Sequence, residues 1–135
     1  MRLNVVLIAT TVLAGLFGLG FLFLPNQMLS LYGMQTDASG IWMGRYFGLT
    51  MVGIAAVAWV LRGVQDGQLQ RQIAMAFLGF ELLGLLVSLW GVFSPEGTSM
   101  VWLSVVIYGL LAAGYALVVM GVGAAVSTPA ARARR

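Results

Sequence analysis

The sequence predicts an all-α integral membrane protein, in which four spanning helices form one bundle and a short interfacial helix follows the first span. Composition supports this, because 61% of the 135 residues are hydrophobic and only 8% are charged, whereas a soluble domain carries about 25% charged residues. Four apolar runs are also each close to the ~20 residues that a helix needs to cross the hydrocarbon layer. A chain of this length suits a single domain.

The first span is expected over residues 4–24, because an apolar run ends there at Pro25. This run is longer than the roughly 7–15 apolar residues of a secretory signal, and no clear Ala-x-Ala cleavage site follows it. We therefore expect the span to be retained. The next segment, PNQMLSLYG, begins with a proline, which a first helical turn tolerates, and ends with Gly33, a residue type preferred just past a helix end. It predicts a short helix on the membrane surface.

Three further spans are expected over residues 41–61, 72–93 and 99–122. Thr36 or Asp37 can cap the start of the second span, and Arg62 closes it. The polar segment SPEG closes the third span. Residues 1–128 then form a four-span membrane domain, and residues 129–135 form a basic tail.

Arginine placement predicts the orientation of the spans, because the cytoplasmic loops of membrane proteins carry an excess of basic residues. Every basic residue of the chain is an arginine, and six of the seven flank the spans on one side. These six are Arg2, Arg62, Arg71, Arg132, Arg134 and Arg135. The loops at residues 25–40 and 94–98 contain none. We therefore expect both termini, the tail and the loop between spans two and three to be cytoplasmic.

The flanking arginines are also candidates to bind anionic lipid headgroups, since a basic residue beside such a surface gains about 1 kcal/mol. The candidates are Arg62, Arg71, Arg132, Arg134 and Arg135. No soluble segment carries a basic stripe with interleaved aromatic residues. The net charge of +3 therefore indicates membrane lipids, and not a nucleic acid, as the anionic partner.

Cysteine and histidine are both absent from the sequence. Their absence removes thiolate and imidazole nucleophiles, ordinary zinc sites and the usual axial ligands of haem. We therefore expect no metal site and no cofactor, and the residue types do not favour an enzyme. In an enzyme, Glu81 would be the only buried general acid or base.

Glu81 is the charged residue deepest in a predicted span. It lies nine residues past Gln72 and twelve before Phe93, which places it near the bilayer midplane, where an ionisable side chain usually marks a functional site. A bare carboxylate is costly at that depth, so we expect Glu81 to face the bundle interior. Tyr108 and Tyr115 of the fourth span lie near its depth and can donate hydrogen bonds to it.

Arg45 lies about 6 Å inside the outer end of the second span, and two interpretations of it stay open. Its long side chain can snorkel outward to the headgroups. It can instead be the outer member of a polar string, with Ser88, Tyr108 and Glu81, that holds the helices in register or positions a ligand. A direct ion pair between Arg45 and Glu81 would have to bridge on the order of 12 Å along the membrane normal.

Small residues four positions apart favour close approach between membrane helices. Each predicted span contains such a pair. The pairs are Ala14 and Gly18, Gly44 and Gly48, Gly84 and Ser88, and Gly109 and Ala113. They predict a tightly packed bundle.

The segment LFLPNQMLSLYG, followed after a spacer by GRYFGLTMVGIAAVAWVLRG, resembles the pattern of small bacterial four-helix membrane proteins of the DoxX-like kind. The matching positions are Pro25, the LYG turn at residues 31–33, Arg45 and Gly48, and the resemblance covers roughly the first half of the chain. It implies a protein of the bacterial inner membrane. Because some proteins of this kind accompany oxidoreductases, it also implies a membrane subunit. It assigns no role to Glu81.

Two classes of function follow from these observations. The favoured class is a structural or accessory membrane subunit that packs against partner membrane proteins or a second copy of itself, because catalytic residue types are scarce and the loops are short. The alternative is a binder of a small lipophilic ligand, such as a quinone or a lipid, held by the polar string. A transporter and a membrane enzyme stay open as further classes.

Overall fold

The computed structural model describes residues 2–95 and 97–126, with side chains up to residue 121. Within these ranges the chain forms five helices and no strand: α1 (Leu3–Phe23), α2 (Pro25–Leu31), α3 (Ala38–Leu61), α4 (Gly67–Phe93) and α5 (Ser99–Val126). Four of them, all but α2, are long and apolar enough to cross a membrane. The prediction of an all-α four-helix membrane bundle with a short helix after the first span is confirmed. The expected tail at residues 129–135 lies outside the described residues.

Aspartate caps start α3 and α4 earlier than the apolar runs indicated. The Asp37 carboxylate accepts a hydrogen bond from the Gly40 amide at 3.0 Å, and the Asp66 carboxylate accepts one from the Leu69 amide at 2.6 Å. Each carboxylate thus pairs with an amide that a helix leaves free in its first turn. Because of this cap α4 begins at Gly67, so its first turn is polar and precedes the span expected from residue 72.

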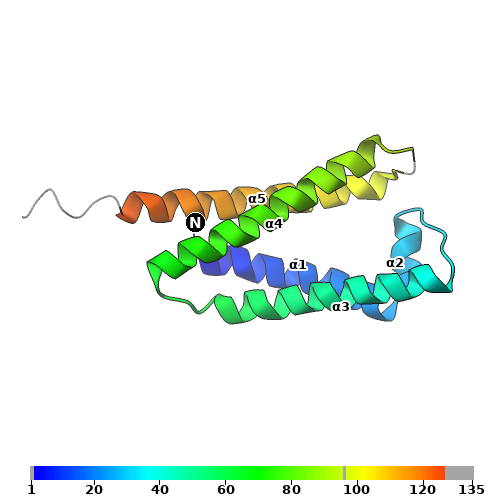
Figure 1. Cartoon of the computed structure of the whole chain (residues 1–135), viewed down its shortest axis with the longest axis horizontal. Coiled ribbons are helices and arrows are strands. Elements are labelled where there is room, and N and C mark those ends of the chain that lie inside the picture. Colours follow the sequence, from blue (N-terminus) through cyan, green and yellow to red (C-terminus); the bar gives the residue numbers. More distant parts are fainter. Residues whose placement is uncertain (1, 96, 127–135) are drawn as a thin grey trace, which may run out of the picture.

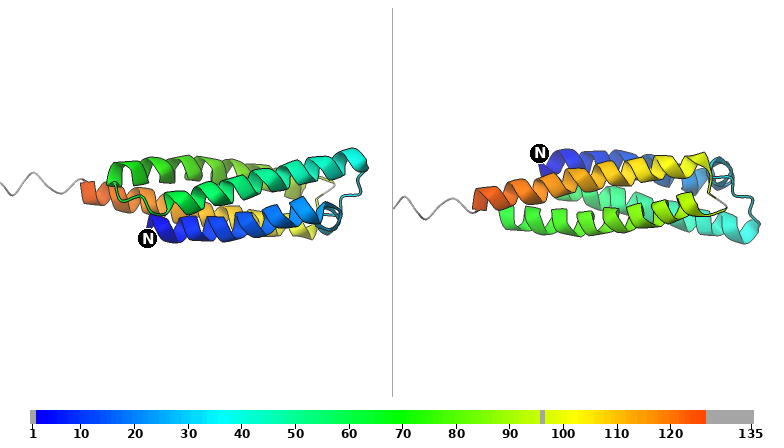
Figure 2. Two further views of the ribbon diagram at one scale, coloured as in Figure 1. Left: turned by 90° about the horizontal axis from the view of Figure 1, so that it is seen from below. Right: turned by 90° about the horizontal axis from the view of Figure 1, so that it is seen from above.

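The short helix α2 follows α1 directly, with Pro25 in its first turn. Gly33 ends it with a φ of +73°, and the Met34 amide donates to the Leu29 carbonyl at 3.0 Å. A left-handed glycine in this position is the expected helix stop. α2 lies across the axes of the long helices at one end of the bundle, here called the α2 end (Figure 1). The start of α1 and the end of α5 lie at the opposite end, here called the terminal end (Figure 2).

The four long helices form two hairpins, α1 with α3 and α4 with α5. The first hairpin is closely packed: a Cβ atom added at Gly48 would lie 2.5 Å from the Leu22 backbone nitrogen, and one at Gly18 would lie 2.8 Å from that of Val52. In the second hairpin, Gly84 lies against the ring of Tyr108. The expected small-residue contacts therefore occur in three of the four spans.

The small-residue pair of the fourth span does not contribute to packing. A Cβ atom added at Gly109 would meet no described atom within 4 Å, and Ala113 is exposed. The expectation of a close contact there is wrong, because the face of α5 that carries this pair points away from both α4 and α1. Spacing alone identifies a face of small residues, but it does not say which way the face points.

The two hairpins meet near the terminal end, where α1 packs against α5. Leu7, Ala74 and Tyr115 are fully buried at this junction. The hydroxyl groups of Thr10 and Tyr115 lie 2.7 Å apart and join α1 to α5 by a hydrogen bond, and Phe77 stacks on Tyr115 with 5.2 Å between ring centroids. Toward the α2 end the two hairpins separate (Figure 1).

Candidate functional site: a cavity between the two hairpins

A cavity of about 830 Å³ lies between the hairpins where they separate. All four long helices contribute to its wall, together with Leu29 of α2 and the following Tyr32. Its inner end is formed by Thr10 of α1, Glu81 of α4 and Leu111 of α5, next to the junction between the hairpins. The volume falls within the range of about 300–1,000 Å³ that is typical of small-molecule sites.

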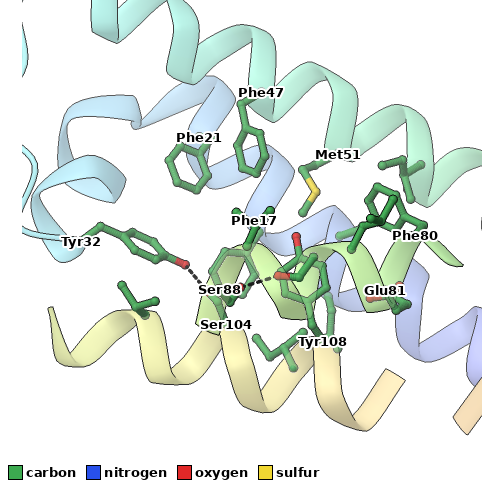
Figure 3. Close-up of a pocket in the computed structure, with 18 of the residues that line it drawn as sticks. Phe17, Phe21, Tyr32, Phe47, Met51, Phe80, Glu81, Ser88, Ser104 and Tyr108 are labelled. Atoms are coloured by element: carbon green, nitrogen blue, oxygen red, sulfur yellow. Dashed lines mark hydrogen bonds between the residues drawn. The ribbon is translucent and has the colours of Figure 1, made fainter. Parts of the chain in front are cut away.

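The wall of the cavity is mainly apolar and rich in aromatic rings. Phe17, Phe21, Phe47 and Phe80 surround it, and the thioether of Met51 projects toward it (Figure 3). The rings of Phe21 and Phe47 pack edge to face with 5.0 Å between centroids, which fixes the two helices of the first hairpin against each other. A ligand in the cavity would contact rigid apolar surfaces from both hairpins.

Six polar side chains also line the cavity. They are Thr10, Tyr32, Glu81, Ser88, Ser104 and Tyr108. Most of them already have hydrogen-bond partners: Thr10 bonds to Tyr115, and the hydroxyls of Tyr32 and Ser104 lie 3.2 Å apart. The Ser88 hydroxyl donates to the Gly84 carbonyl at 2.8 Å within α4.

Glu81 and Tyr108 are the two of these six side chains that form no hydrogen bond with another described residue. The Glu81 side chain is only 1% exposed, so the expectation that it faces the bundle interior is confirmed. The Oε2 atom of Glu81 is buried and has no hydrogen-bond partner within the described part of the chain. Tyr115, expected as a donor, is bonded to Thr10 and does not line the cavity. Thr11, at a similar depth, donates to the carbonyls of Leu7 and Ala55.

Arg45 lies apart from the other members of the expected polar string. Its guanidinium group sits 5.0 Å from the centroid of the Trp42 ring, and the residue does not line the cavity. Gly44 and Phe47 face the cavity in this part of α3, so the side chain of Arg45 projects from another side of the helix. The structure therefore brings together Glu81, Ser88 and Tyr108, without Arg45.

Two of the five arginines that are predicted to bind lipid headgroups lie within the described residues. Arg62 and Arg71 are exposed near the terminal end, and the Arg62 guanidinium lies 3.5 Å from the centroid of the Trp59 ring. Such stacking beside an exposed tryptophan is typical of a headgroup region. Arg132, Arg134 and Arg135 lie outside the described residues.

Sequence reasoning missed two features of the cavity. The sequence pattern places Tyr32 in a surface helix, but its hydroxyl bonds to Ser104 of the opposite hairpin. Nothing in the pattern marks the ring of Phe80, next to Glu81, as part of the wall. Periodicity along one helix cannot find a contact between residues 72 positions apart, and no other signal in a single sequence links these two hydroxyl groups.

Comparison of the chain with protein-family models, with curated proteins and with solved structures found no match. The cavity and its side chains are therefore the features that indicate function. Their arrangement can hold an apolar molecule and offer it one deeply placed carboxyl group.

Proposed function

We propose that this multi-pass membrane protein binds a small lipophilic molecule in the cavity between its hairpins. The observation that carries the proposal is the separation of the hairpins over an apolar volume of about 830 Å³, although each hairpin is closely packed within itself. The cavity is open to its surroundings, since the lining residues Leu83 and Val87 are 65% and 71% exposed. A bound lipophilic molecule would make dispersion contacts with apolar side chains of both hairpins at once, which favours ligand binding over a purely structural subunit.

We further propose an inner-membrane location with both termini in the cytoplasm. The support is the distribution of arginines along the sequence, the resemblance to DoxX-like proteins, and the position of the start of α1 and the end of α5 at the same end of the bundle (Figure 1). In this orientation the cavity occupies the outer half of the membrane, with Glu81 near the midplane.

A cavity-filling substitution tests the binding proposal. Met51 projects into the cavity (Figure 3), so Met51→Trp should occupy the volume that a ligand needs. Met75→Trp makes the same change on α4 at a residue that is 45% exposed and does not line the cavity. Native mass spectrometry with dodecanol as the probe should show one adduct on the wild type and on Met75→Trp, and an at least fivefold smaller adduct on Met51→Trp.

Equal dodecanol adducts on all three proteins would contradict binding in the cavity. That result would favour a structural or accessory subunit instead. Thermal unfolding of each variant in the same detergent provides the control, because both tryptophan variants must stay folded for the adducts to be compared.

A further inference from the structure

Two polar side chains of the cavity, Tyr108 and Glu81, form no hydrogen bond with another described residue, and of these the Glu81 Oε2 atom is fully buried. The hydroxyls of Thr10, Ser88 and Ser104 are each engaged with protein partners. The Oε2 atom of Glu81, in contrast, is buried without a partner. A carboxyl oxygen in an apolar interior is strongly stabilised by a hydrogen-bond donor. The described side chains supply none to this atom, so a ligand that carries a donor would complete the site.

The charge of the cavity excludes acidic ligands. No arginine of the described residues lines it, and the nearest arginine along α3, Arg45, lies over Trp42. The phosphate of a phospholipid or the carboxylate of a fatty acid would therefore enter beside Glu81 without a cation to pair with. A buried charge without a partner is costly.

The aromatic rings of the cavity wall favour a cation for a second reason. Phe17, Phe80 and Tyr108 all line the cavity together with Glu81 (Figure 3). The faces of aromatic rings carry negative charge density and attract ammonium groups, by about 0.5–2 kcal/mol per contact. The ring faces give no such attraction to a carbonyl oxygen, which also carries negative charge, and the Tyr108 hydroxyl is the group that could donate to one.

We propose that the cavity selects lipophilic amines, whose nitrogen pairs with the Glu81 carboxyl group while the apolar chain lies along the aromatic wall. This inference rests on the proposed function, because it names the chemical class of the ligand of the same cavity. The pair shares one proton between the amine nitrogen and the carboxyl oxygen. An ammonium with a carboxylate, or an amine with a carboxylic acid, brings no net charge into the apolar interior.

Three probes with the same dodecyl chain test this selectivity: dodecylamine, dodecanol, and dodecyl methyl ketone. They offer a basic nitrogen, a hydroxyl group and a carbonyl acceptor. We expect the wild type to bind dodecylamine at least tenfold more tightly than either of the others, a difference of about 1.4 kcal/mol. Glu81→Gln should reduce amine binding at least tenfold while changing dodecanol binding by less than about twofold.

Asp66→Asn serves as the matched control. It also removes one carboxylate from α4, but at the helix cap, outside the cavity, and asparagine caps a helix as well as aspartate does. The preference for the amine should persist in this variant. Its loss there would show that the preference comes from general electrostatic attraction and would overturn the inference.

Two further results would overturn the inference and spare the proposed function. One is equal binding of all three probes by the wild type, and the other is stronger binding of the ketone, which would make Glu81 a donor to a carbonyl.

Met51→Trp provides a second test for the case in which Glu81→Gln does not fold. If it blocks dodecanol but not dodecylamine, the amine binds elsewhere and the inference fails. If no probe binds the wild type, the proposed function itself fails.

Discussion

At the scale of single residues, the hydrogen bond between Thr10 and Tyr115 is the more deeply buried of two polar contacts between the described parts of the hairpins, the other being Tyr32 with Ser104. Tyr115→Phe should lower the free energy of unfolding by about 0.5–1.5 kcal/mol, because hydrogen bonds between membrane helices contribute about 0.6 kcal/mol on average and up to about 1.7. Equilibrium unfolding in mixed detergent measures this. The double variant with Thr10→Val should lose less than the sum of the single losses, and strictly additive losses would contradict the contact.

Spacing along the sequence predicted the interior position of Glu81, because a carboxyl group near the midplane has few other places to lie. The same reasoning did not decide the direction in which the side chain of Arg45 points. Near a membrane surface a long basic side chain can turn several ways at similar cost, and the structure shows it over Trp42. The unpaired state of Glu81 Oε2 could not be predicted, because it depends on which groups the hydroxyls of Tyr115 and Thr11 bond to.

At the scale of helices, the contact between α1 and α3 leaves no room for a side chain at Gly48. In Gly48→Ala the new Cβ atom would meet the backbone of Leu22 and Gly18, which cannot move aside as a flexible side chain can. We expect a loss of about 1–3 kcal/mol of stability, measured as a lower thermal unfolding midpoint. Gly53→Ala on the same helix meets no described atom within 4 Å and should leave the midpoint unchanged or raised, because alanine favours a helix. Equal losses for both would contradict the close contact.

The number and type of the helices could be predicted because each span satisfies its backbone hydrogen bonds internally and must be apolar over a fixed length. Helix ends were harder to predict. The polar turn before residue 72 forms part of α4 because Asp66 caps it, and a hydropathy pattern reports only the apolar part of a helix. The cavity between the two hairpins depends on side-chain shape and was not predicted.

At the scale of the whole molecule, the arginine distribution predicts that the α2 end faces outward. The chain contains no cysteine, so a single introduced cysteine can report which side of the membrane its loop faces. Gln35→Cys and Gln65→Cys both change an exposed loop residue and leave the capping aspartates unchanged. A membrane-impermeant maleimide added to intact spheroplasts should label position 35 at once and position 65 only after permeabilisation. Labelling of position 65 in intact spheroplasts would reverse the proposed orientation.

The division into two hairpins also has a consequence for how the chain is made. Each hairpin is one continuous stretch, residues 3–61 and 67–126, so most of its packing joins segments that leave the ribosome one after the other. Membrane helices insert first and associate afterwards, and the first hairpin can therefore be complete before the second is synthesised. The connection at residues 62–66 then acts as a tether, and a cut there would leave the packing inside each half intact.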